Sequence, residues 1–167
     1  MIYRIDNKNI LLTAFLGSSA ELLIKKTNDY KTLFLPNDKI ADSQKLINVI
    51  SKEKIKNVIS FGQKPNIKNK VHIETTAKDG KYCIDTNFNC GSLKLLLEKN
   101  NITSKISHNA GTSYCNELYL NGLKYIFQNN LDIKMVFVHI PFKKNVADFD
   151  SFCKCIFDVI EGIVSLS

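Results

Sequence analysis

Cys115 is the residue whose type and position best suit nucleophilic chemistry. It follows a sharp predicted turn at Asn109–Gly111 and falls in the first turn of a predicted helix over 112–128. Backbone N–H groups and the positive end of the helix dipole favour a thiolate there, and the thiolate is the nucleophile. Spacing alone also allows a buried core cysteine, because Leu118 and Tyr119 share its helix face.

His139 and Glu74 supply a candidate base and a candidate carboxylate. His139 stands near the carboxyl end of the predicted strand 135–140, and ligands of parallel α/β sheets bind beyond such ends. A core-edge histidine satisfied by one hydrogen bond is the alternative. Glu74 lies midway along the alternating segment Val71–Ala77, where a solvent-facing carboxylate is the plainer interpretation. His72 projects to the same face as Glu74.

A thiol, an imidazole and a carboxylate are the set that a cysteine hydrolase requires. The thiol needs a base within hydrogen-bond reach, and the base needs a third group that fixes its tautomer and orientation. Such a triad is defined in space, so the chain order Glu74, Cys115, His139 is no obstacle. The elements that carry them must therefore bring these side chains to one side of a sheet.

Apolar runs of strand length alternate with segments of helical periodicity along the chain. The predicted strands are 9–15, 32–35, 57–61, 71–77, 105–107 and 135–140, and the predicted helices are 20–27, 39–52, 92–99, 112–128 and 147–166. This alternation predicts an α/β fold, a three-layer α/β/α sandwich with a mostly parallel central sheet. No repeat or linker interrupts residues 1–167, so we expect a single domain.

Composition and charge exclude several classes of protein. The chain has 23 basic and 16 acidic residues, a net charge of +7, but Arg4 is its sole arginine and the lysines are scattered. Nucleic-acid readers concentrate charge on one face and rely on Arg, so no nucleic acid is expected as a partner. No apolar run approaches the ~18 residues of a membrane span, and residues 1–8 lack the order of a signal peptide. We expect a cytoplasmic protein with no membrane partner.

The five cysteines do not form a recognisable framework. Their odd number and spacing fit reduced thiols better than disulfides. Neither they nor the three histidines show metal-binding intervals, so no metal and no cofactor are expected. The cysteines without an assigned role are Cys83, Cys90, Cys153 and Cys155.

The residues around these candidates resemble the motifs of a known family. Ser107–Asn116 (SHNAGTSYCN) is similar to the nucleophile motif of the pyroglutamyl peptidases (pyrrolidone carboxyl peptidases, type I), and Val136–Pro141 (VFVHIP) is similar to their histidine motif. Gly62–Gln63 followed by Glu74–Ala77 (ETTA) resembles the segment that supplies their glutamate, and Leu12–Phe15 (LTAF) resembles their first strand. The chain is thus identified as a shortened member of this family.

The resemblance implies a cytosolic cysteine exopeptidase, of phosphorylase/hydrolase-like fold, that removes N-terminal 5-oxoproline from peptides. Cys115 would be the nucleophile, His139 the general base and then acid, and Glu74 the group that orients His139. The implied partner is a small peptide with a blocked N-terminus. Oligomer contacts are common in this family, so a homo-oligomer is a further expectation.

The resemblance also implies a substrate site. Phe15 and Gln63 match positions associated with the pocket for the lactam ring. The turn at Ala110–Gly111 and the start of the next helix would place backbone N–H donors near the oxyanion, where one donor typically contributes about 2.7–4 kcal/mol.

Two segments are shorter than the family pattern, the loop after Phe15 and the stretch between Glu74 and Leu93. After Phe15, other aromatic residues expected to line the lactam pocket have no counterparts. Two alternatives to a pyroglutamyl peptidase therefore stay open. One is a shortened relative with altered amide specificity, and the other is a catalytically inactive binding protein that keeps the fold.

Overall fold

Strands and helices alternate through the described chain, much as the sequence predicts. The computed structural model describes residues 9–166; residues 1–8, on which the expectation about a signal peptide rests, and residue 167 lie outside the described part. The elements are, in order, β1 (Ile10–Phe15), α1 (Ser19–Ile24), β2 (Lys31–Leu35), α2 (Lys39–Lys52), β3 (Asn57–Lys64), β4 (Lys70–Glu74), β5 (Thr76–Asp79), β6 (Tyr82–Asp85), α3 (Cys90–Lys99), β7 (Thr103–Ser107), α4 (Tyr114–Gln128), β8 (Lys134–Pro141), η2 (Lys143–Asn145) and α5 (Phe149–Leu166).

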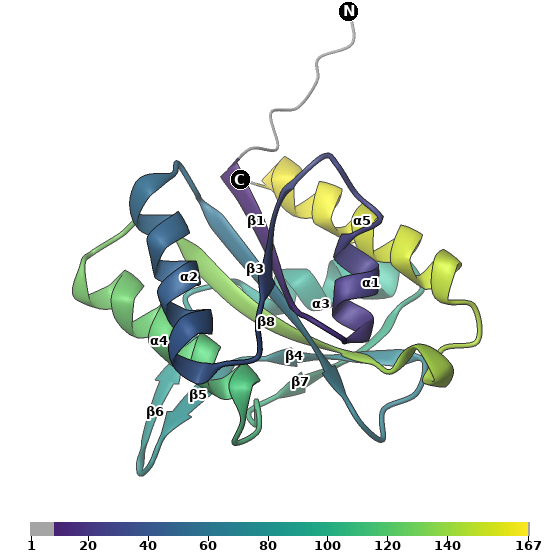
Figure 1. Ribbon diagram of the computed structural model, residues 1–167. Helices are drawn as coiled ribbons and strands as arrows, with labels where there is room; N and C mark the ends of the chain where they lie inside the picture. Colours follow the sequence, from purple (N-terminus) through teal and green to yellow (C-terminus); the bar gives the residue numbers. More distant parts are fainter. Residues whose placement is uncertain (1–8, 167) are drawn as a thin grey trace, which may run out of the picture.

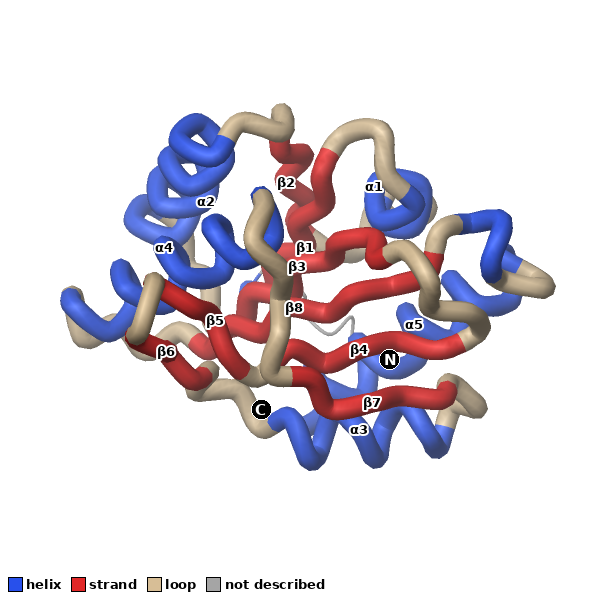
Figure 2. Tube along the Cα trace, turned by 90° about the horizontal axis from the view of Figure 1, so that it is seen from below, coloured by secondary structure: helices blue, strands red, loops and turns tan. Residues whose placement is uncertain are grey.

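Two layers of helices enclose a six-stranded sheet of order β2-β1-β3-β8-β4-β7. Helices α1, α3 and α5 cover one face, and α2 and α4 cover the other (Figures 1 and 2). The strand pairs are parallel except that β4 runs antiparallel to β8. The predicted α/β sandwich with a mostly parallel central sheet is confirmed.

The central strands explain the apolar runs of the sequence. All residues of β1 are buried, as is β3 from Asn57 to Gly62. Leu11 packs on the α2 and α4 side, while Ile10 and Leu12 pack on the other. Both faces of these strands are covered, so both sets of alternating side chains must be apolar.

Helix α2 has the predicted bounds because its ends are encoded locally. The Asp38 carboxylate accepts hydrogen bonds from the N–H groups of Ile40 and Ala41 and caps the first turn. Its apolar residues Leu46 and Ile50 are buried against the sheet layer. Among the described residues, no helix has both the length and the apolar character needed to cross a bilayer.

The prediction of a single strand over 71–77 is wrong. The chain leaves the sheet after Glu74, and the Thr75 N–H donates to the Ser107 carbonyl at 2.8 Å. Residues 76–79 then pair with 82–85 in a separate hairpin that projects beside α4 (Figure 1). Gly80, with φ +56°, lies in the turn between β5 and β6. Strand β6 was not predicted, because its mostly exposed residues give no clear alternation.

Candidate active site

Cys115 is the second residue of α4, and the loop before it is held by local hydrogen bonds. The Gly111 N–H donates to Asn109 Oδ1 at 3.1 Å, and the Asn109 N–H donates to Ser107 Oγ at 3.3 Å. Gly111 has φ +90°, a conformation that favours glycine. Ser113 caps α4 without a side-chain hydrogen bond, which leaves first-turn N–H groups free of a side-chain acceptor.

The sulfur of Cys115 lies against the end of β3, beside the strand that carries His139. A Cβ added to Gly62 would be 2.8 Å from Cys115 Sγ and 2.9 Å from the Phe137 ring. Gly62 pairs with His139 in the parallel register of β3 and β8, so both residues face the same side. The Phe137 and His139 rings are 4.9 Å apart between centroids. No hydrogen bond joins the Cys115 thiol to the His139 ring in the described part, so that pairing stays a prediction.

Glu74 and His139 form a buried pair. His139 Nδ1 lies 2.8 Å from Glu74 Oε1, and the two side chains are 4% and 0% exposed. The alternative of a solvent-facing Glu74 is therefore wrong. Strand β4 is antiparallel to β8, and in this register Glu74 lies opposite Phe137. Phe137 is two residues from His139, so Glu74 and His139 lie on the same face of the sheet. The Tyr119 hydroxyl donates to the Glu74 carbonyl at 2.7 Å and fixes this strand end to α4.

The surroundings of Glu74 keep it ionised. Burial alone raises the pKa of this carboxyl group, but hydrogen bonds from His139, Ser107 and Lys64 outweigh that effect, and the net pKa lies below its ordinary value. An anionic Glu74 accepts the Nδ1 proton of His139, which leaves Nε2 as the free ring nitrogen.

The surroundings of Cys115 favour its neutral thiol form. Burial raises its pKa to about 12, and the negative charges of Glu74 and Asp42 act in the same direction. The sequence alone favoured a thiolate at the start of a helix; burial outweighs that helix effect. Any reaction that uses this sulfur as a nucleophile therefore has to include a step that removes its proton.

The residues predicted to bind substrate fall into two groups. Phe15 is buried, with its ring centroid 6.3 Å from Tyr114 and 6.5 Å from Phe137. Ala110 is buried in the same cluster, on the α2 and α4 side. Gln63 differs, because its Oε1 accepts a hydrogen bond from the Ser19 N–H at 3.0 Å and its side chain thus lies against the start of α1. The Gly111 N–H is held by Asn109, and its oxyanion role stays a prediction.

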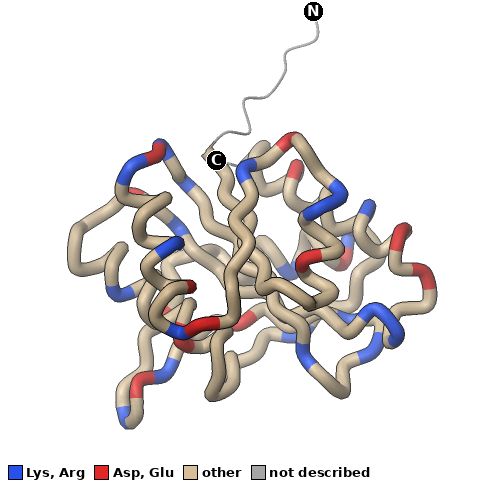
Figure 3. Tube along the Cα trace, in the orientation of Figure 1, with Lys and Arg blue, Asp and Glu red and all other residues tan. Residues whose placement is uncertain are grey.

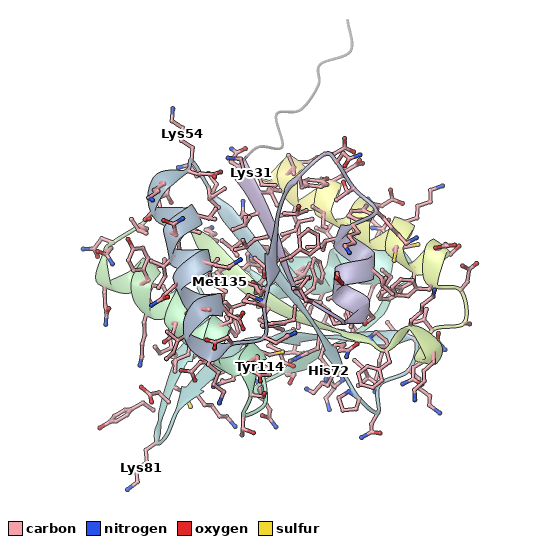
Figure 4. The ribbon with its side chains drawn as sticks, viewed as in Figure 1. Lys31, Lys54, His72, Lys81, Tyr114 and Met135 are labelled. Carbon is pink, nitrogen blue, oxygen red and sulfur yellow. The ribbon has the colours of Figure 1, made fainter. Side chains whose placement is uncertain are left out.

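Three residues at this site have no role assigned from the sequence. Gly62, Lys64 and Phe137 lie on the same sheet face as His139. Extending the predicted strand 57–61 by three residues would have placed Gly62 and Lys64 on that face. Figure 4 labels Tyr114, at the start of α4, and His72, on β4, in the lower central part of the view.

The remaining thiols lie outside this cluster. All five cysteines are free, with Cys83 exposed and Cys153 buried against the α5 side of the core. Within residues 9–166, no three side chains of His, Cys, Asp or Glu gather in an arrangement that could hold a metal ion.

The fold and these side chains define a class, the α/β/α proteins in which a helix-start cysteine lies beside a buried histidine–carboxylate pair. The family model of pyroglutamyl peptidase matches residues 35–153. The chain belongs to the pyroglutamyl peptidase family.

Individual relatives agree in sequence over part of their length. The pyrrolidone-carboxylate peptidase of Brachyspira hyodysenteriae is 35% identical over 86 residues, which are 52% of this chain and 43% of the relative. Pyrrolidone-carboxylate peptidase 2 of Caldanaerobacter subterraneus is 48% identical over 46 residues, 28% of this chain and 22% of the relative. The sequence matches thus span less than half the length of these curated relatives.

Solved structures agree in fold over nearly the whole chain. The pyrrolidone carboxyl peptidase of Fervidobacterium islandicum superposes with a TM-score of 0.82 at 19% identity, covering 93% of this chain and 98% of that one. The pyroglutamyl peptidase I of Bacillus amyloliquefaciens gives 0.80 at 19% identity, covering 92% and 93%.

Proposed function

We propose that this protein is a cysteine exopeptidase that removes N-terminal 5-oxoproline from peptides. The observation that carries the proposal is the buried hydrogen bond between His139 and Glu74, 2.8 Å long, next to the strand position over which Cys115 Sγ lies. Family membership supports the same reaction class, hydrolysis of a peptide bond.

The proposed reaction starts from a neutral thiol and a neutral imidazole. His139 Nε2 takes the proton of Cys115 as the sulfur attacks the carbonyl carbon of the 5-oxoprolyl residue, and a tetrahedral oxyanion forms. In this scheme the oxyanion accepts from N–H groups at the start of α4, where Ser113 makes no side-chain capping hydrogen bond. The intermediate collapses to a thioester as the protonated His139 gives its proton to the leaving amine.

Water then completes the cycle. His139 removes a proton from water, which attacks the thioester and releases free 5-oxoproline, and the Cys115 thiol is restored. Glu74 stabilises the imidazolium in both halves by accepting from Nδ1. General-base catalysis typically raises the reaction rate by ~10²–10⁴-fold.

Aromatic side chains near Cys115 suit a small neutral ring. Phe15 and Phe137 are buried, and Tyr114, next to the nucleophile, is 40% exposed. A flat lactam is held well between aromatic walls with a few polar contacts. Tyr114, through its contact with Phe15, is our candidate for the wall nearest solvent.

The test is hydrolysis of a pyroglutamyl-coumarin amide. The wild-type protein should release the fluorophore, and Cys115→Ala should abolish release because no other group can form the thioester. Cys83→Ala, at an exposed thiol, is the matched control and should be fully active. Release that survives Cys115→Ala would remove Cys115 from the reaction.

A second candidate is a relative with altered amide specificity. Only Leu16–Ser18 separate β1 from α1, so the segment after Phe15 is short. The same fluorophore on acetyl-amino acids and on larger lactams separates the two candidates. Activity confined to the pyroglutamyl amide would exclude the second.

A further inference from the structure

Two histidines lie near one carboxylate at this site. His72 and His139 stand directly opposite each other on β4 and β8, and Glu74 lies two residues from His72 on the same face. His72 is 9% exposed and His139 is 3% exposed. A protonated His72 would have the charge and the donor needed to take Glu74 from His139.

The Lys64 ammonium group contacts both Glu74 and His72. From the end of β3, its Nζ is 3.1 Å from Glu74 Oε1, 3.2 Å from His72 Nδ1 and 3.2 Å from the Asn109 carbonyl oxygen. An ammonium group has three N–H donors, and these contacts use all three. With a side chain only 25% exposed, Lys64 acts inside the site rather than as a solvated charge.

The contact with Lys64 indicates the protonation state of His72. Lysine can only donate, so His72 Nδ1 accepts in this contact and the ring is neutral. Its proton is then on Nε2, which is buried and has no hydrogen-bond partner among the described residues. Burial lowers the pKa of His72, and the positive charges of Lys64, Lys70 and Lys105 lower it further against the opposing effect of Glu74. A neutral His72 whose Nδ1 is occupied cannot donate from that nitrogen to Glu74.

We propose that Lys64 is a positioning residue that reserves Glu74 for His139 by holding His72 neutral. The same ammonium group also donates to the carbonyl oxygen of Asn109, which lies in the loop before Cys115. It thereby links that loop to Glu74 and His72. The proposal deepens the proposed hydrolysis and rests on it for its catalytic consequence.

The direct test is NMR of histidine-labelled protein, which needs no activity. The chain has three histidines, so three ring signals are expected. In Lys64→Met the titration midpoint of His72 should move to higher pH, since a neighbouring positive charge is gone. Lys64→Arg should keep it low, and Lys68→Met, at an exposed lysine after β3, should leave it unchanged. An unmoved His72 midpoint in Lys64→Met would overturn the proposal.

The catalytic test uses a suppressor. Lys64→Met should lower kcat at least ~10-fold, part of the range of general-base catalysis, with little change in KM. Lys64→Arg should retain most of kcat. Adding His72→Gln to Lys64→Met should restore part of kcat, because glutamine cannot become a competing cation. A double variant no better than Lys64→Met, with the Tm of both preserved, contradicts the proposal.

The two hypotheses can fail separately. If the wild-type protein hydrolyses no pyroglutamyl amide, the proposed function fails, whereas the NMR titration still decides whether Lys64 controls His72. If hydrolysis is normal and Lys64→Met has wild-type kcat, only the role of Lys64 fails.

Discussion

At the scale of single residues, buried charge governs the behaviour of the site. Glu74 stays ionised because its hydrogen-bond donors outweigh burial, while burial dominates at Cys115 and at Asp42 in the first turn of α2. Asp42 is 1% exposed, and its negative charge is one of the influences that raise the pKa of Cys115. Burial and these charges thus favour the thiol form of Cys115.

Asp42 gives a prediction about stability and pH. Burial raises the pKa of Asp42, and the backbone N–H groups of Asp38 and Asn37 oppose this only in part. A carboxyl group whose folded pKa is raised binds its proton more tightly when folded, so stability falls as the pH rises from the unfolded value, about 4, through the folded pKa. Asp42→Asn should therefore raise the Tm at pH 7 by a few degrees, and the gain should shrink toward pH 4.

Thermal melts at both pH values check this prediction, with Asp158→Asn on the exposed face of α5 as the control. The same variant should speed alkylation of Cys115 by iodoacetamide, because a charge that opposes the thiolate is gone. A Tm difference that is unchanged between pH 7 and pH 4 would contradict the electrostatic account of Asp42.

At the scale of elements, the end of β3 sets the packing against Cys115 Sγ and the position of Lys64. This strand runs to Lys64, which places Gly62 beneath Cys115 Sγ and Lys64 within reach of β4. Strand β4 runs antiparallel to β8, and in this register Glu74 is within hydrogen-bond distance of His139. Lys64, His139 and Glu74 come together because β3, β8 and β4, which carry them, are neighbours in the sheet.

Gly62→Ala tests this close packing. The new methyl group would lie 2.8 Å from Cys115 Sγ and 2.9 Å from Phe137, so the sulfur or the ring must move. We expect kcat/KM for the pyroglutamyl amide to fall by about 10²-fold, the typical cost of a displacement near 1 Å. Gly91→Ala on α3, whose nearest atom is at an ordinary 3.5 Å, is the control. Equal activity of the two variants would show that the sulfur position tolerates the methyl group.

At the scale of the whole molecule, the charge is positive and dispersed. The net charge is +7, and Figure 3 shows lysines distributed among acidic residues over the helices and loops. Such a field raises encounter rates with anionic ligands, and salt screens it. It does not by itself create a binding surface for a polyanion.

A salt series tests this long-range effect on the proposed substrate. A pyroglutamyl peptide followed by two Asp residues should have a kcat/KM a few-fold above that of its Lys counterpart at low salt. The ratio should approach one at about 1 M salt, where the Debye length is roughly 3 Å. A ratio that does not change with salt would show that any preference between the Asp and Lys peptides arises from local contacts.

The sequence by itself determined the alternation of elements, the bounds of α2, the sandwich, and the identity of Cys115, His139 and Glu74 as candidates. These follow from local periodicity, capping and motif resemblance, which a linear chain contains. Only the tertiary structure decided the reversal of β4, the burial of Glu74, the raised pKa of Cys115 and the contact of Lys64 with both Glu74 and His72. Those properties depend on which strands become neighbours and on how much water their packing removes, and neither quantity is a property of one segment.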